Sequence, residues 1–251
     1  MDFKKNKLFF IIVGLAFLAA GVLTLSFYYR QKIAGNAGKE AAENNAAEND
    51  ALKPAQNFPG QIYLDVPFTP QAPFGNWEDV RQDNGCEEAC LLMAMAWVND
   101  KKITPEEALK EILAMVDFQL ENYGHFHDTS AQDTFKLLKE YFKYENAFIQ
   151  FDIGAKDIKN QLAGGNLVIV PIDGSKVNNP FYTPPGPDQH KILIRGYEDA
   201  TGEFITNDPG TSRGEGYRYK YEILESALMD YKSGFHEIID EIKTAMIVVK
   251  K

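Results

Sequence analysis

The order of the sequence patterns along the chain predicts an α+β domain. Helical patterns come first, and the segment from Cys86 to Val98 is apolar on nearly every side, as expected of a central, buried helix. After Gly164 and Gly165 the pattern changes to short runs rich in β-branched residues, which are typical of strands. Helices followed by strands favour an antiparallel sheet with helices packed on it over alternating β-α units.

The N-terminal segment predicts a membrane anchor. Residues 1–7 form a short tail with three lysines, and an uninterrupted apolar run extends from Leu8 to Tyr29. About 20 apolar residues span a bilayer, whereas the apolar core of a signal peptide usually has about 7–15. We interpret residues 8–29 as one transmembrane helix, with a signal peptide, cleaved or uncleaved, as the alternative. Either way, the rest of the chain is expected outside the cytoplasm.

Residues 30–60 are expected to form a flexible linker. From Ile33 to Gln56 the chain is mostly Ala, Asn, Glu, Gly and Lys and has no aromatic residue, so it cannot bury enough surface to fold. The folded domain is therefore expected to occupy residues 61–251.

Local signals place the elements of this domain. A short strand at 62–66 is followed by a long loop rich in proline and glycine. After the central helix, Thr104-Pro105-Glu106-Glu107 forms a capping box that opens a second helix. Apolar residues at helical spacing predict further helices at 130–144 and 155–162. The strands predicted to follow are 167–172, 191–197, 203–207, 216–221 and 244–249.

Composition excludes several classes of function. The 251 residues carry a formal net charge of −10 without a cluster of Lys or Arg, which argues against a nucleic-acid partner. Two cysteines can form neither a disulfide framework nor a four-thiolate zinc site. Cys86 and Cys90 share one helix face, so we expect one reactive thiol and one core residue rather than a disulfide.

Cys86 lies where a loop runs directly into the central helix. A thiol in the first helical turn faces unpaired backbone N–H groups and the positive end of the helix dipole, and both favour the thiolate. A nucleophilic cysteine also needs a base and a group that orients the base. His190 begins a predicted strand, and Asp208 follows the next strand, so adjacent antiparallel strands can bring Asp208 to the His190 ring.

Four segments stand in a recognisable order along the chain: Val66-Pro67-Phe68-Thr69-Pro70-Gln71, Gly85-Cys86-Glu87-Glu88-Ala89, His190 to Gly196, and Asn207-Asp208-Pro209-Gly210. Together they resemble the C39-like family of papain-fold cysteine peptidases, from about Tyr63 to Val249. The resemblance implies a papain-like fold, with a central N-terminal helix packed on an antiparallel sheet. It also implies Cys86 as nucleophile, His190 as general base and acid, Asp208 as orienting group, and no cofactor. Gln71 fits the glutamine of the oxyanion hole by motif position, and Gln82 is the alternative.

Glu87 and Glu88 depart from the Cys-Gly-Pro or Cys-Gly-Ala that is common at the nucleophile of this family. Two carboxylates beside a thiolate raise its pKa, unless they point away or contribute to substrate choice. Acidic residues are also favoured in the first turn of any helix, which explains both without a function. The pair leaves open a selective nucleophile or a catalytically silent binding module.

The remaining candidates carry weaker signals. His125-Phe126-His127-Asp128 places alternate polar residues on one face, but no third ligand spacing supports a metal site, so none is predicted. His236 is expected at the surface. Trp77 and the prolines around it either line the substrate cleft or only pack the long loop. The aromatic-rich loop 179–187 before His190 is a candidate lid.

These observations predict a membrane-anchored hydrolase that cleaves peptide or isopeptide bonds outside the cytoplasm through a Cys86-His190-Asp208 triad. Its expected partners are a peptide or protein, including cell-wall peptide, and the membrane through the N-terminal helix. The alternatives are the silent binding module and a peptidoglycan amidase or endopeptidase with the same Cys-His order. Transfer of the acyl group to an amine instead of water is also chemically possible. The sequence does not indicate an oligomeric state.

Overall fold

The computed structural model describes residues 58–234 and 243–251, which fold around one antiparallel sheet. Along the sheet the strands lie in the order β2, β7, β3, β4, β5, β6, and β1 pairs with β4 beside this path. The strands are β1 (Gln61–Tyr63), β2 (Ala147–Phe151), β3 (Leu167–Ile172), β4 (His190–Glu198), β5 (Glu203–Asn207), β6 (Glu215–Lys220) and β7 (Ala245–Val249).

The central strand β4 has different partners along its length. β3 pairs with its first half, up to Ile194, and β1 pairs with its last three residues, from Gly196 to Glu198. A Cβ atom at Gly196 would collide with the carbonyl oxygen of Ile62, so only glycine allows β1 to approach this closely. His190 at the start of β4 is therefore held by a strand that is anchored by pairing along its whole length.

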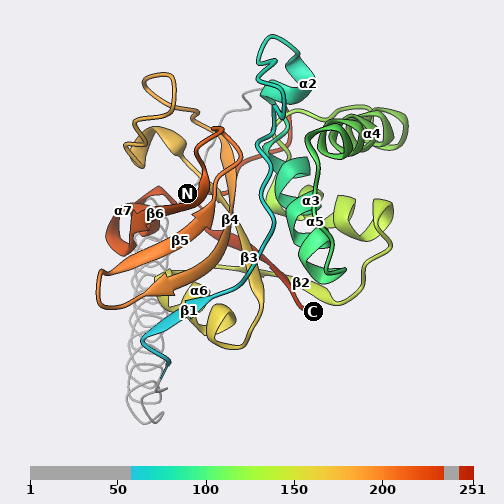
Figure 1. Ribbon diagram of the computed structural model, residues 1–251. Coiled ribbons are helices and arrows are strands. Elements are labelled where there is room, and N and C mark those ends of the chain that lie inside the picture. The colour runs from blue at the N-terminus through green and yellow to red at the C-terminus, as the bar shows by residue number, and fades with distance from the viewer. Residues whose placement is uncertain (1–57, 235–242) are drawn as a thin grey trace, which may run out of the picture. The chain divides into compact units, whose positions relative to one another are not determined.

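Helices cover both faces of the sheet (Figure 1). α3 (Cys86–Val98), α4 (Pro105–Tyr123) and α5 (Ala131–Tyr141) lie on one face, and α6 (Ala155–Ala163) and α7 (Tyr221–Ala227) lie on the other. Successive side chains of β3 point to opposite faces of the sheet. Leu167 and Ile169 therefore pack with α3, whereas Val168 and Val170 pack with α6. Two short elements, α2 (Val80–Asp83) and the 3₁₀ turn η1 (Gly174–Lys176), lie in the connecting loops.

The predicted α+β class and the central helix are confirmed. Eleven of the thirteen residues of α3 are buried, which is why the helix lacks a polar face in the sequence. It packs against Leu193 of β4 and Ile247 of β7 in one apolar core. The start of α3 is thereby fixed next to the start of β4.

Several boundaries differ from the sequence prediction. The first strand ends at Tyr63 rather than at residue 66, and the third predicted helix ends at Tyr141 because Lys143 has a positive φ of 54°. β2 was not predicted; it is a half-buried edge strand that depends on pairing with β7. Tyr221, predicted to end a strand, instead begins α7, which the sequence analysis missed together with α2.

The predicted tail, anchor and most of the linker, residues 1–57, lie outside the described residues, as does His236. Within 58–234 and 243–251, no helix combines the length and apolar character needed to cross a membrane.

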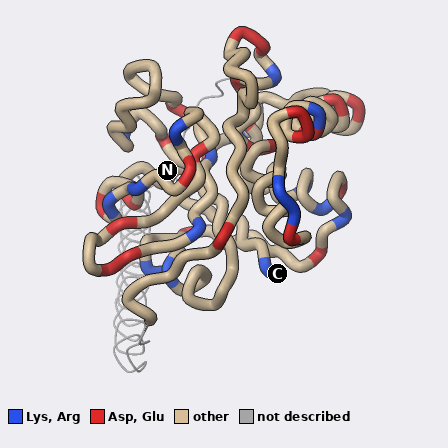
Figure 2. The backbone as a smooth tube through the Cα atoms, viewed as in Figure 1, with Lys and Arg blue, Asp and Glu red and all other residues tan. Residues whose placement is uncertain are grey.

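Charged residues of both signs are interspersed along the backbone in the view of Figure 2. Ion pairs join side chains on β4, β5 and β6, for example between Arg218 and Glu198 (2.6 Å) and between Lys220 and Glu203 (2.9 Å). Exposed pairs of this kind contribute about 0–1 kcal/mol each, so the sheet depends on its two apolar cores rather than on these contacts.

Candidate active site

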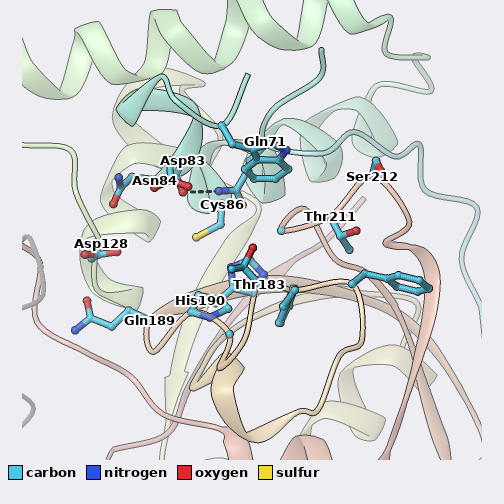
Figure 3. A pocket seen from close by; sticks show the side chains of 16 residues that line it. Gln71, Asp83, Asn84, Cys86, Asp128, Thr183, Gln189, His190, Thr211 and Ser212 are labelled. Carbon is cyan, nitrogen blue, oxygen red and sulfur yellow. Dashed lines mark hydrogen bonds between the residues drawn. The ribbon is translucent and has the colours of Figure 1, made fainter. Parts of the chain in front are cut away.

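One cleft brings together three of the four residues that the sequence singled out. It has a volume of about 460 Å³ and lies where the start of α3 meets the start of β4. Figure 3 shows Gln71 and Cys86 on one side and His190 on the other, with the sulfur of Cys86 directed into the space between them. The other lining residues include Trp77, Asp83, Asn84, Asp128, Phe181, Tyr182, Gln189, Gly210, Thr211 and Ser212.

The loop before Cys86 determines where α3 begins. Asp79 caps α2, because its carboxylate accepts a hydrogen bond from the backbone N–H of Arg81 (3.1 Å). At Gly85 a Cβ atom would lie 3.0 Å from the carbonyl oxygen of Arg81, so the chain turns there without room for a side chain. Cys86 is then the first residue of α3, and its backbone N–H is among those that have no partner within the helix.

The expected preference of Cys86 for the thiolate is wrong for this geometry. The side chain is 5% exposed, and Sγ donates a hydrogen bond to Oε2 of Glu87 (3.1 Å). Burial raises the pKa of the Cys86 thiol well above its usual value, and the Glu87 carboxylate raises it further, while the charge of Lys191 opposes both. Burial and Glu87 therefore favour the neutral thiol in this geometry.

His190 and Asp208 lie in direct contact. Nε2 of His190 is 2.9 Å from Oδ1 of Asp208, and both side chains are buried. Because a carboxylate can only accept, Nε2 carries the proton and Nδ1 is the ring nitrogen that can accept one. A Cβ atom at Gly210 would lie 2.9 Å from Cε1 of His190, so glycine there gives the ring its space.

Asp208 is surrounded by donors that sequence reasoning missed. Its Oδ2 accepts hydrogen bonds from the hydroxyls of Tyr182 (2.5 Å) and Tyr219 (2.6 Å) and from Nδ2 of Asn179 (3.3 Å). Oδ1 accepts from the backbone N–H of Gly210 (3.0 Å) as well as from His190. Asn179 and Tyr182 come from the loop before β4 and Tyr219 comes from β6, so no local motif connects these three with Asp208.

This environment keeps Asp208 ionised. Burial alone would raise its pKa, but the charge and hydrogen bond of His190 and the hydroxyls of Tyr182 and Tyr219 outweigh burial and lower it. The same carboxylate, together with burial, raises the pKa of both tyrosines, so they remain neutral donors. Asp208 can therefore orient His190 and stabilise a positive charge on its ring.

The structure separates the two candidate glutamines. Gln71 lines the cleft, and its Nε2 donates one hydrogen bond to the carbonyl oxygen of Asp83 (2.6 Å), which leaves a second N–H on the same nitrogen. Gln82 does not line the cleft, and its Nε2 donates to Asp79 (3.2 Å). Position therefore favours Gln71 as a donor to a bound carbonyl oxygen.

Glu87 and Glu88 lie in the first turn of α3, where acidic residues are favoured, and both are buried. Glu87 accepts from Lys191 (3.2 Å) and Tyr231 (2.9 Å) in addition to Cys86. Glu88 points elsewhere and accepts from Nε2 of Gln119 (2.5 Å). Only Glu87 contacts the thiol.

The elevated pKa of Glu88 predicts that the stability of the protein falls as pH rises. Burial raises its pKa to about 8, and the charge of Glu87 adds to the rise. An unfolded glutamate ionises near pH 4.3, so the contribution of neutral Glu88 to stability is fully present below that pH. It is lost as the pH rises toward 8, and the free energy of unfolding falls by about 1.4 kcal/mol per pH unit. In the Glu88→Gln variant this loss should be absent, because an amide does not titrate, and the glutamine oxygen can still accept from Nε2 of Gln119. Urea denaturation of both proteins at pH 5 and pH 8 measures the difference, and equal losses in the two would contradict it.

Of the remaining candidates, Cys90 lies outside the cleft and Trp77 lines it. Cys90 is fully buried, its thiol contacts the carbonyl oxygen of Lys191 (3.5 Å), and both cysteines are free, so no disulfide joins them. Trp77 and Phe181 both line the cleft and are 39% and 40% exposed, which leaves apolar surface for a ligand. Among the residues that the structure describes, no group of three or more His, Cys, Asp or Glu could hold a metal ion.

A known protein family matches this chain over most of its length. Residues 63–238, which include all four candidate residues, match the Peptidase C39-like family. A structure described as a C39-like peptidase from Bacillus anthracis is 15% identical, with a TM-score of 0.49, and the match covers 76% of this chain and 98% of that one. Xylellain, a cysteine protease from Xylella fastidiosa, is 14% identical, with a TM-score of 0.38, covering 77% and 87%. No curated protein matches the sequence significantly.

Proposed function

This chain belongs to the Peptidase C39-like family of cysteine peptidases, and on that premise we propose that it hydrolyses peptide or isopeptide bonds with Cys86 as the nucleophile. The observation that carries the proposal is the shared cleft. Cys86 and His190 both line it, and His190 is held 2.9 Å from the buried carboxylate of Asp208. A thiol, a base and a group that orients the base are what nucleophilic catalysis by cysteine requires.

The first half of the reaction forms an acyl-enzyme. Nδ1 of His190 takes the proton of Cys86, and the thiolate attacks the carbonyl carbon of the substrate. Nε2–H of Gln71 and the backbone N–H of Cys86 stabilise the negative oxygen that develops. The imidazolium of His190, stabilised by Asp208, then protonates the leaving amine, and the C–N bond breaks.

The second half releases the acyl group. His190, again neutral, takes a proton from a water molecule, whose oxygen attacks the thioester. The tetrahedral oxygen occupies the same site beside Gln71, and the C–S bond breaks to give a carboxylic acid and the free thiol. If an amine replaces the water, the same chemistry gives acyl transfer.

The proposed setting is the outer side of a membrane. The support is the apolar run from Leu8 to Tyr29, which has the length of a transmembrane helix and leaves the domain on the far side of the bilayer from the lysine-rich tail. A domain in that position meets extracellular peptides and cell-wall peptide, and these are the substrates we propose.

Peptide hydrolysis by the purified full chain in a mild detergent tests the function. A peptide library and purified cell wall are incubated with the protein, and the products are identified by mass spectrometry. We expect new carboxyl and amino termini in a subset of the peptides, and no products after the thiol is blocked with iodoacetamide. Release of stem-peptide fragments from the wall would identify the protein as a peptidoglycan amidase or endopeptidase.

The silent binding module makes the opposite prediction. The hydrogen bond from Cys86 to Glu87 favours it, because a thiol held in the neutral form is a poor nucleophile. No cleavage of any peptide or wall fragment, combined with saturable peptide binding in the cleft, would support the binding module and reject hydrolysis.

A further inference from the structure

The residues that follow the nucleophile and the base form a second network beneath the cleft. Glu87 follows Cys86 on α3, and Lys191 follows His190 on β4. Their side chains meet at 3.2 Å, and both are almost completely buried, at 1% and 0% exposure. The ion pair therefore joins the two elements that carry the proposed nucleophile and base.

The hydrogen bonds of this network converge on Glu87. Lys191 has three N–H donors and no acceptor, and it donates to Glu87, to the hydroxyl of Tyr231 (2.9 Å) and to the carbonyl oxygen of Thr129. Because the Tyr231 oxygen accepts from Lys191, its own proton goes to Oε1 of Glu87 (2.9 Å). Glu87 thus accepts at Oε1 from its ion-pair partner Lys191 and from Tyr231, and its Oε2 is directed at Cys86.

The only proton of the Cys86 thiol lies in the contact with Glu87. Sγ is 3.1 Å from Oε2 of Glu87, and a thiol with one proton cannot donate to a second acceptor at the same time. A thiolate at that place would face an ionised carboxylate in a buried site, which is unfavourable. His190 can take the proton only when the thiol leaves Glu87.

On the premise of the proposed function, we propose that Glu87 is a positioning residue that stores Cys86 as a neutral thiol. Catalysis then begins when Sγ turns from Glu87 to Nδ1 of His190. Lys191 and Tyr231 act through Glu87, because they hold its carboxylate in place. The remaining titratable groups around the thiol are Cys90 and Glu88 on α3, His190 and Asp208 on the sheet side, and Asp83 and Asp128 on the cleft wall.

The Glu87→Gln variant tests the proposal. The glutamine oxygen can accept from Lys191 and Tyr231, while its N–H donates toward Sγ and favours the thiolate. We expect the midpoint of the Cys86 alkylation rate against pH to move at least about one pH unit lower, which makes alkylation about tenfold faster on the acidic side. The matched control is Glu88→Gln, one residue further along α3, which contacts Gln119 and should leave the midpoint unchanged.

An unchanged midpoint in Glu87→Gln, or an equal shift in both variants, would overturn the proposal. If Glu87→Gln does not fold, infrared spectroscopy of the Cys90→Ala protein, which has one thiol, provides the second measurement. We expect the S–H stretching band of a hydrogen-bonded thiol at neutral pH, and its absence would contradict storage as a thiol. Both measurements work without substrate, so they are independent of whether peptides are hydrolysed.

Discussion

Replacing Cys86 by alanine is expected to abolish both peptide hydrolysis and labelling by a thiol-reactive acyl probe. The acyl-enzyme cannot form without Sγ, and the oxyanion donors alone do not replace a nucleophile, so turnover should fall by roughly four or more orders of magnitude. The side chain is small and lies beside the cleft, so the fold should be retained. Steady-state hydrolysis and mass spectrometry of the labelled protein measure the two losses, and circular dichroism checks the fold.

Cys90→Ala is the matched control for this prediction. It removes the other cysteine, one helical turn away and fully buried, whose thiol contacts a backbone carbonyl oxygen rather than the cleft. Labelling and turnover should both survive, with a loss of stability on the order of 1 kcal/mol. Labelling that persists in Cys86→Ala but disappears in Cys90→Ala would reverse the assignment of the nucleophile.

The features that the sequence predicts correctly are those set by local rules. The apolar helix at Cys86–Val98, the capping box at Thr104 and the β-branched run at Leu167–Ile172 each carry a strong signal within a few residues. The approach of Asp208 to His190 also follows from local information, because both lie at corresponding ends of adjacent antiparallel strands. Order along the chain was sufficient to predict these parts of the fold and the site.

The features that the sequence does not predict depend on contacts between distant segments. Glu87 lies in the first turn of α3, where an acidic residue is expected for local reasons, and the local sequence does not indicate its buried ion pair with Lys191 of β4. The helix start at Cys86 likewise predicts a thiolate from local sequence, whereas the cost of burying that charge depends on the whole fold. Tyr182 and Tyr219 lie 37 residues apart in sequence, and nothing local indicates that both donate to Asp208.

Replacing Asp208 by alanine is expected to have the largest combined effect on stability and activity. The carboxylate accepts hydrogen bonds from His190, Tyr182, Tyr219, Asn179 and the backbone of Gly210, and all five donors would lose their acceptor. Removal of one partner of a buried charged network typically costs about 3–5 kcal/mol. Without Asp208, His190 loses its orientation and the charge that stabilises its imidazolium, so kcat/KM should fall roughly 10²–10⁴-fold. Denaturant titration and steady-state hydrolysis measure the two effects, and wild-type turnover in Asp208→Ala would contradict the orienting role.

Asp208→Asn separates orientation from charge and remains informative if the alanine variant does not fold. The amide oxygen can still accept from Nε2 of His190, but the negative charge is lost. Because the pKa of Asp208 is lowered in the folded state, its charge stabilises the protein above the pKa of an unfolded aspartate, near 3.9, and this contribution disappears as pH falls through the lower folded value. The stability difference between wild type and Asp208→Asn should therefore be complete at neutral pH and shrink in acid. If Asp208→Asn retains most of the turnover while losing this pH-dependent stability, Asp208 serves catalysis by orienting His190. If turnover falls as far as in Asp208→Ala, its charge is what the imidazolium requires.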